Sequence, residues 1–179
     1  MKSNFREIVA EFTGPPVNIE AIIRAVGVDL DKKADLDPEI AGQLQRLEDG
    51  SFKISVNKAD TYYRQRFTMA HELGHFLMHT HLIGEGVDDS RAYRSSPEGN
   101  FFNRSIGRRE ETQANQFAAK LLLPKSVLLS IAKPGMTIKE VSRKLQASIP
   151  ATEIRLKALG FELDETSIVG VPGEAPPEP

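Results

Sequence analysis

All four histidines of the chain lie within eleven residues, as His71, His75, His79 and His81. Residues 71–75 read HELGH, which matches the pattern H-E-x-x-H. On a helix, residues four apart lie on one face about one turn apart, so two imidazoles can converge on one metal ion. A carboxylate one position after the first histidine can reach a water on that ion without being a ligand. The cluster therefore predicts a metal site on a helix, with Glu72 as general base.

The amino-acid composition excludes several kinds of site and several classes of protein. No cysteine occurs among the 179 residues, which excludes disulfides, thiolate metal sites and cysteine nucleophiles. The net charge of −2 provides no excess of positive charge for a nucleic acid, so DNA binding is not expected. No apolar run is long enough for a signal peptide or a membrane span. We therefore expect a cytoplasmic protein without a membrane anchor.

The first half of the chain mixes helical and strand patterns. Apolar residues at helical spacing predict helices over 2–13 and 18–27, the second with Asn18 as N-cap. The polar segment 29–39 is interpreted as a linker. Asp49-Gly50 then separates two alternating segments, 42–48 and 51–57, and this pattern is typical of an antiparallel hairpin.

The second half is predicted to be mainly helical. The histidine helix is expected to begin between residues 61 and 66 and to end near residue 80. Residues 82–109 have little periodicity and are interpreted as a long loop. Four further helices are predicted over 110–123, over 126–132, from Thr137 (with Glu140 in a capping box) and over 151–159.

A catalytic zinc site needs a third protein ligand, and three candidates exist. His79 lies about 12 Å from His71 along the helix axis, which favours a supporting or surface role. His81 stands at the third-ligand position of the longer pattern H-E-x-x-H-x-x-G-x-x-H, but Met78 replaces the glycine that turns the chain. Glu111 precedes Asn115 by one helical turn, so it could ligate the metal while Asn115 supports an imidazole. Glu110 and Glu111 could equally complement a helix N-terminus, and the residues alone leave this open.

Two separated segments carry a resemblance to a known family. Residues 64–75 read RQRFTMAHELGH and residues 111–124 read ETQANQFAAKLLLP. In this order they resemble the signatures of the ImmA/IrrE family of zinc metallopeptidases, over roughly residues 16–160. The resemblance implies that His71, His75 and Glu111 bind Zn²⁺ and that Glu72 is the general base. The chain departs from the family at Gln113, where a second glutamate is common.

The resemblance also implies the fold. We expect an α+β, zincin-like architecture, in which a small antiparallel sheet packs on the active-site helix and further helices follow. Residues 136–162 resemble the terminal helical pair of the family. A single metallopeptidase domain is predicted over 1–168, with a flexible tail over 169–179.

The function implied is that of a zinc-dependent endopeptidase that cleaves a helix-turn-helix transcriptional repressor or antitoxin. The alternative is a non-catalytic, toxin-like or regulatory module that binds such a repressor. The strand 52–57 could accept an extended peptide by edge pairing. Possible oxyanion donors are Tyr62, Tyr63, Tyr93, Arg94 and His81. Arginines at 91, 94, 104, 108 and 109 make the predicted loop basic, which suits a lid, a surface for an acidic partner or an ordinary solvated loop.

Overall fold

The computed structural model describes residues 2–12, 14–83, 86–90 and 106–173. The chain divides into two compact units. The first comprises Met1–Phe12 and Asn18–Ala118, and the second comprises Thr13–Val17 and Ala119–Pro179. The single domain predicted over 1–168 stays a prediction, because a compact unit is defined by its internal contacts and not by folding on its own.

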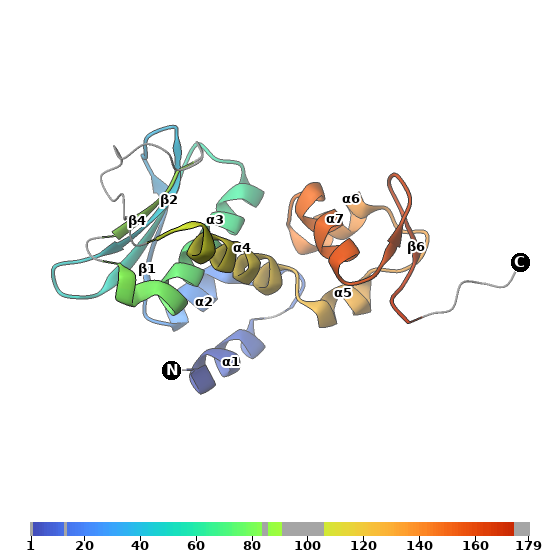
Figure 1. Cartoon of the computed structure of the whole chain (residues 1–179), viewed down its shortest axis with the longest axis horizontal. Helices are drawn as coiled ribbons and strands as arrows, with labels where there is room; N and C mark the ends of the chain where they lie inside the picture. Colours follow the sequence, from blue (N-terminus) through green and yellow to red (C-terminus); the bar gives the residue numbers. More distant parts are fainter. Residues whose placement is uncertain (1, 13, 84–85, 91–105, 174–179) are drawn as a thin grey trace, which may run out of the picture. The chain divides into compact units, whose positions relative to one another are not determined.

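A four-stranded sheet in the order β1-β3-β2-β4 forms one layer of the first unit (Figure 1). Its strands are β1 (Asp29–Ala34), β2 (Ile40–Arg46), β3 (Phe52–Asn57) and β4 (Gly86–Ser90). The predicted hairpin is confirmed, since β2 and β3 pair antiparallel around a turn in which Gly50 has a φ of 83°. The predicted antiparallel pairing holds for β2 with β3 and with β4, but β1 runs parallel to β3, so the sheet is mixed.

Three further predictions about this sheet are wrong. The linker assigned to 29–39 contains β1, and the loop assigned to 82–109 contains β4. Both strands lie at the ends of the strand order, and neither sequence carries a strong apolar alternation. The strand predicted to accept a peptide, 52–57, is β3, which is paired on both sides and has no free edge.

Helix α3 (Tyr62–His79) packs on β2 and β3. Leu44 of β2 and Ile54 of β3 are fully buried, and the ring of Phe76 in α3 packs edge-on against Phe52 of β3. Helix α2 (Ile19–Ala25) contacts α3 and β1 through buried isoleucines, and the predicted Asn18 cap is confirmed by a 3.1 Å bond from the Ala21 amide. Helix α1 (Lys2–Glu11) precedes it, and the short helix η1 (Thr80–Leu82) follows α3.

Gly42 of β2 allows α3 to lie close to the sheet. A Cβ at this position would overlap Thr68 Cγ2 and would lie 3.1 Å from the Ser55 carbonyl oxygen and 3.7 Å from Glu72 Cγ. Only a residue without a side chain leaves room for this turn of the helix. The strand thus supports α3 directly at the turn that carries Glu72.

Helix α4 (Arg108–Leu122) crosses the boundary between the units, and the second unit continues with three helices. These are α5 (Lys125–Ile131), α6 (Ile138–Leu145) and α7 (Ile149–Ala158). The predicted capping box is confirmed, because the Thr137 side chain and the Glu140 side chain each bond the other's backbone amide.

A two-stranded sheet of β5 (Glu162–Leu163) and β6 (Ile168–Gly170) completes the second unit. Regular structure therefore continues past residue 169, where the predicted tail was to begin, and residues 174–179 lie outside the described part. No described helix is long and apolar enough to span a membrane. The α+β class with a zincin-like helix on a sheet is confirmed.

Candidate metal centre

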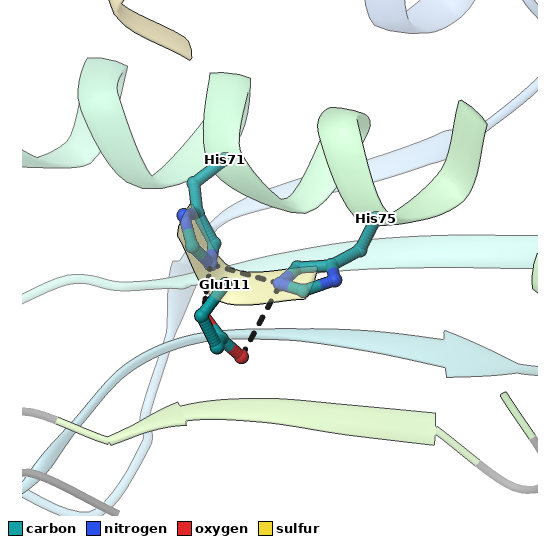
Figure 2. Close-up of side chains that lie close together, drawn as sticks. All are labelled: His71, His75 and Glu111. Carbon is teal, nitrogen blue, oxygen red and sulfur yellow. Dashed lines mark hydrogen bonds and ion pairs between the residues drawn. The ribbon is translucent and has the colours of Figure 1, made fainter. Parts of the chain in front are cut away.

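Two helices bring the three predicted ligands together. His71 and His75 project from one face of α3, and Glu111 projects from the first turn of α4 (Figure 2). All three side chains are almost fully buried, with exposed fractions of 2%, 0% and 5% for His71, His75 and Glu111. A buried cluster of this kind is costly unless its members pair with one another or hold an ion.

The distances between the facing atoms are those of a metal coordination shell. His71 Nε2 lies 3.0 Å from His75 Nε2 and 3.2 Å from Glu111 Oε2, and His75 Nε2 lies 3.5 Å from Glu111 Oε1 (Figure 2). Zinc bonds of about 2.0–2.2 Å place the ligands of a tetrahedral site about 3.3–3.6 Å apart, which is close to the separations of 3.0–3.5 Å in this group. Among the described residues, this is the one group of His, Cys, Asp or Glu that could hold a metal.

The electrostatics of the cluster favour the protonation states that metal binding needs. Burial by itself raises the pKa of the Glu111 carboxyl, but hydrogen bonds and charges from His71 and His75 outweigh it and lower that pKa to about 2. Burial lowers the pKa of His75, although Glu111 opposes the shift. Near neutral pH, Glu111 is thus a carboxylate and His75 is disposed to be neutral, as a ligand must be.

The side chains of Glu110 and Glu111 have different neighbours, although both residues lie in the first turn of α4. Glu110 Oε2 accepts a 2.9 Å hydrogen bond from the Gly107 amide at the start of α4, and backbone hydrogen bonds lower its pKa. Glu110 therefore serves the helix N-terminus, whereas Glu111 faces the two histidines. His81 is exposed in η1 and does not belong to the group.

Each histidine of the group has a partner on the side away from Glu111. Asn115 Oδ1 lies 3.0 Å from His71 Nδ1, which agrees with the support expected of Asn115. His75 Nδ1 lies 3.1 Å from His79 Nδ1, and His79 is only 3% exposed, so it is a buried neighbour and not a surface residue. His79 Nε2 in turn lies 2.9 Å from Gln113 Oε1, a contact that the sequence analysis missed.

Gly74 of α3 allows α4 to approach α3 closely. A Cβ on this residue would lie 3.1 Å from Phe117 Cδ1 and 3.3 Å from Ala114 Cα. A larger residue at this position would push α4 away from the histidines. Gly42 has the corresponding role on the sheet side and was not identified from the sequence.

Glu72 is fully buried on the same helix. Its Cγ lies on the side of α3 that faces Gly42 of β2. The carboxyl group thus comes from the helix turn that carries His71 and is enclosed by helix and sheet.

The remaining residues singled out from the sequence lie elsewhere. Tyr62 and Tyr63 are exposed in the first turn of α3, about 12 Å along the helix axis from His71, which disfavours them as donors at this site. Arg108 and Arg109 are exposed in the first turn of α4. The other predicted loop residues lie outside the described part: Arg91, Tyr93, Arg94 and Arg104.

Comparison with known families gives one finding. Residues 38–157 match the model of the family Peptidase_M78, described as an IrrE N-terminal-like domain. The match covers more than half of the chain and includes all three residues of the group. No curated protein matches the chain.

Proposed function

The chain belongs to the Peptidase_M78 family, and from this premise we propose that it is a zinc-dependent endopeptidase. The observation that carries the proposal is the group of His71, His75 and Glu111, whose facing atoms lie within 4.8 Å of one another. Three protein ligands with room for a fourth are typical of catalytic zinc, whereas structural zinc sites have four. The two histidines and the carboxylate would hold the ion.

The ion and the protein would divide the chemistry. Bound zinc supplies a Lewis acid that polarises a peptide carbonyl and lowers the pKa of water toward about 7. Glu72 would take a proton from the attacking water and pass it to the leaving nitrogen. Its burial between α3 and β2 supports this role, because a carboxylate enclosed by protein keeps its position and is shielded from bulk water.

The peptide would lie along β4. Among the described strands, β4 pairs with β2 on one side and ends the strand order on the other, so it is an edge. An extended peptide can add to such an edge through backbone hydrogen bonds. β2 also contacts α3, and a peptide on β4 would thus lie one strand away from the strand that supports Glu72.

For the substrate, we propose a helix-turn-helix transcriptional repressor or antitoxin. The support is the resemblance of residues 64–75 and 111–124 to the ImmA/IrrE metallopeptidases. The alternative is a regulatory module that binds such a repressor without cleaving it. Glu72 favours the peptidase, because a site that only holds a metal needs the ligands and not the base.

The substitution Glu72→Gln separates the two functions. The purified protein, loaded with zinc, is incubated with a helix-turn-helix repressor from the same genome, and cleavage is followed by mass spectrometry. We expect the variant to lose cleavage by about 100- to 10,000-fold, because general base catalysis contributes that much. Zinc content by elemental analysis and repressor binding should both persist.

Two outcomes would contradict the peptidase. One is cleavage that survives Glu72→Gln, and the other is a wild-type protein that binds both zinc and repressor but leaves the repressor intact. Glu165→Gln is a matched control, because it makes the same change at an exposed position outside the metal group and should leave cleavage unchanged.

A further inference from the structure

Behind His75, three side chains form a continuous chain of polar contacts. His79 Nδ1 lies 3.1 Å from His75 Nδ1, and His79 Nε2 lies 2.9 Å from Gln113 Oε1. His79 comes from the last turn of α3 and Gln113 comes from α4, so the chain links the two helices that supply the metal group. Both histidines are shielded from water, with exposed fractions of 0% and 3%.

The roles of donor and acceptor along this chain follow from the chemistry of imidazole. His75 points Nε2 at His71 and Glu111, so a metal bound there would need the Nε2 lone pair. The single proton of neutral His75 must then be on Nδ1, and it points at His79 Nδ1. His79 must accept at Nδ1 and so carries its own proton on Nε2. That proton is donated to Gln113 Oε1, and an amide oxygen can only accept.

We propose that His79 and Gln113 are positioning residues that hold His75 in the tautomer and ring orientation required for metal binding. The inference rests on the proposed metal site and adds two residues to it. Neither residue would be a metal ligand, because neither belongs to the group of His71, His75 and Glu111. Each acts through its neighbour, with Gln113 fixing the tautomer of His79, which then orients His75.

The two ligand histidines are thus held in different ways by the same helix. The Nδ1 atom of His71 contacts Asn115 of α4 directly, whereas the Nδ1 atom of His75 is linked to α4 through His79. Asn115 is exposed, so water competes for the bond to His71, whereas His75 and His79 are buried and Gln113 is half-buried. Loss of the Gln113 acceptor would leave the N–H donor of the buried His79 without compensation, so we expect the chain behind His75 to matter more.

Matched pairs of variants test the proposal. Gln113→Leu removes the acceptor at similar volume, and Gln116→Leu makes the same change at an exposed position of α4. His79→Phe removes the middle residue of the chain, and His81→Phe makes the same change at an exposed position. Gln113→Glu keeps an acceptor oxygen at the same reach and serves as the conservative rescue.

Zinc affinity is measured by competition with a chelator, and the cobalt-loaded forms are compared by visible absorption. We expect Gln113→Leu and His79→Phe to bind zinc about 10- to 100-fold more weakly and to show an altered cobalt spectrum. The two surface variants and Gln113→Glu should stay close to the wild type. Thermal denaturation of each metal-free variant separates loss of the site from loss of folding.

The results also separate this proposal from the metal site. If Glu111→Ala abolishes zinc binding while Gln113→Leu and His79→Phe bind like the wild type, the positioning role is overturned and the site stands. If Glu111→Ala binds zinc as tightly as the wild type, the metal site itself is wrong and the positioning role falls with it. Should His79→Phe fail to fold, the half-buried Gln113 still decides the question.

Discussion

Helices α3 and α6 are stabilised in opposite ways. α6 carries its own signals, with a complete capping box at Thr137 and an end at Gln146 in the left-handed conformation. α3 has no side-chain hydrogen bond at its Thr61 cap and contains Gly74 in its interior. It also buries several polar side chains, which are Arg66, Thr68, His71, Glu72, His75 and His79. The comparison indicates that the helix with the chemistry depends on tertiary packing, whereas the helix without it is locally favoured.

The addition of zinc should have the largest effect on this contrast between α3 and α6. Free zinc at about 1,000 times its dissociation constant should stabilise the folded state by about 4 kcal/mol, because the ion binds only the assembled site. Hydrogen exchange should show the gain of protection in α3 and α4. Glu111→Gln should remove most of it. Equal gains in the α6–α7 region, or a gain that persists in the variant, would remove the distinction between the two regions.

Gly74→Ala tests whether packing outweighs propensity in α3. Alanine favours a helix over glycine by about 1 kcal/mol, but the new methyl would press on Phe117 and on the backbone at Ala114. We expect a net loss of about 1–3 kcal/mol in the free energy of unfolding, measured by urea denaturation. Lys120→Ala, at an exposed position of α4, should change it by less than about 0.5 kcal/mol. A stabilised Gly74→Ala variant would mean that α3 is governed by propensity after all.

The two threonine caps provide a smaller, matched comparison. Thr137→Ala removes a cap that bonds the Glu140 amide, and we expect a loss of about 1 kcal/mol in the free energy of unfolding. Thr61→Ala removes a side chain that makes no cap bond, and its effect should stay within about 0.5 kcal/mol. Urea denaturation of both variants measures the difference, and equal losses would contradict it.

The smallest expected effect is the pH dependence of the stability that the capping box contributes. Hydrogen bonds from the Thr137 backbone and side chain lower the pKa of the Glu140 carboxyl. A lowered folded-state pKa contributes stability that is fully present above the unfolded value near 4.5 and is lost as pH falls through the folded value. The difference in unfolding free energy between wild type and Glu140→Gln should therefore shrink on acidification. A difference that stays constant down to pH 3 would argue against the carboxylate as its source.

Much of the helical structure and the site could be predicted from local pattern. The H-E-x-x-H spacing placed His71 and His75 on one face, and the interval between Glu111 and Asn115 identified both residues that face the group. The choice of Glu111 over the helix-terminus role came from the family resemblance. The structure supports it, because Glu110 bonds the Gly107 amide instead.

The sheet was harder to predict, because its edges carry weak patterns. β1 has polar side chains along most of its length, including Asp31 and Lys32, which form ion pairs with Lys53 and Glu20. The sequence of such a strand resembles that of a linker unless the strand with which it pairs is known. The strand order was also unknown from the sequence, and β3 was therefore predicted to be an edge strand that could bind a peptide.

The amino-acid sequence by itself determined the helix starts and stops, the hairpin and the two motifs, because these depend on residues within one or two turns of each other. Only the tertiary structure decided which strands are edges, that Gly42 and Gly74 admit close packing, and that Gln113 reaches His79. Residues 111 and 113 are two apart, a spacing that does not place them on one helix face. Glu111 faces the two ligand histidines and Gln113 contacts His79 because of how α4 packs against α3, and no short-range sequence pattern predicts that packing.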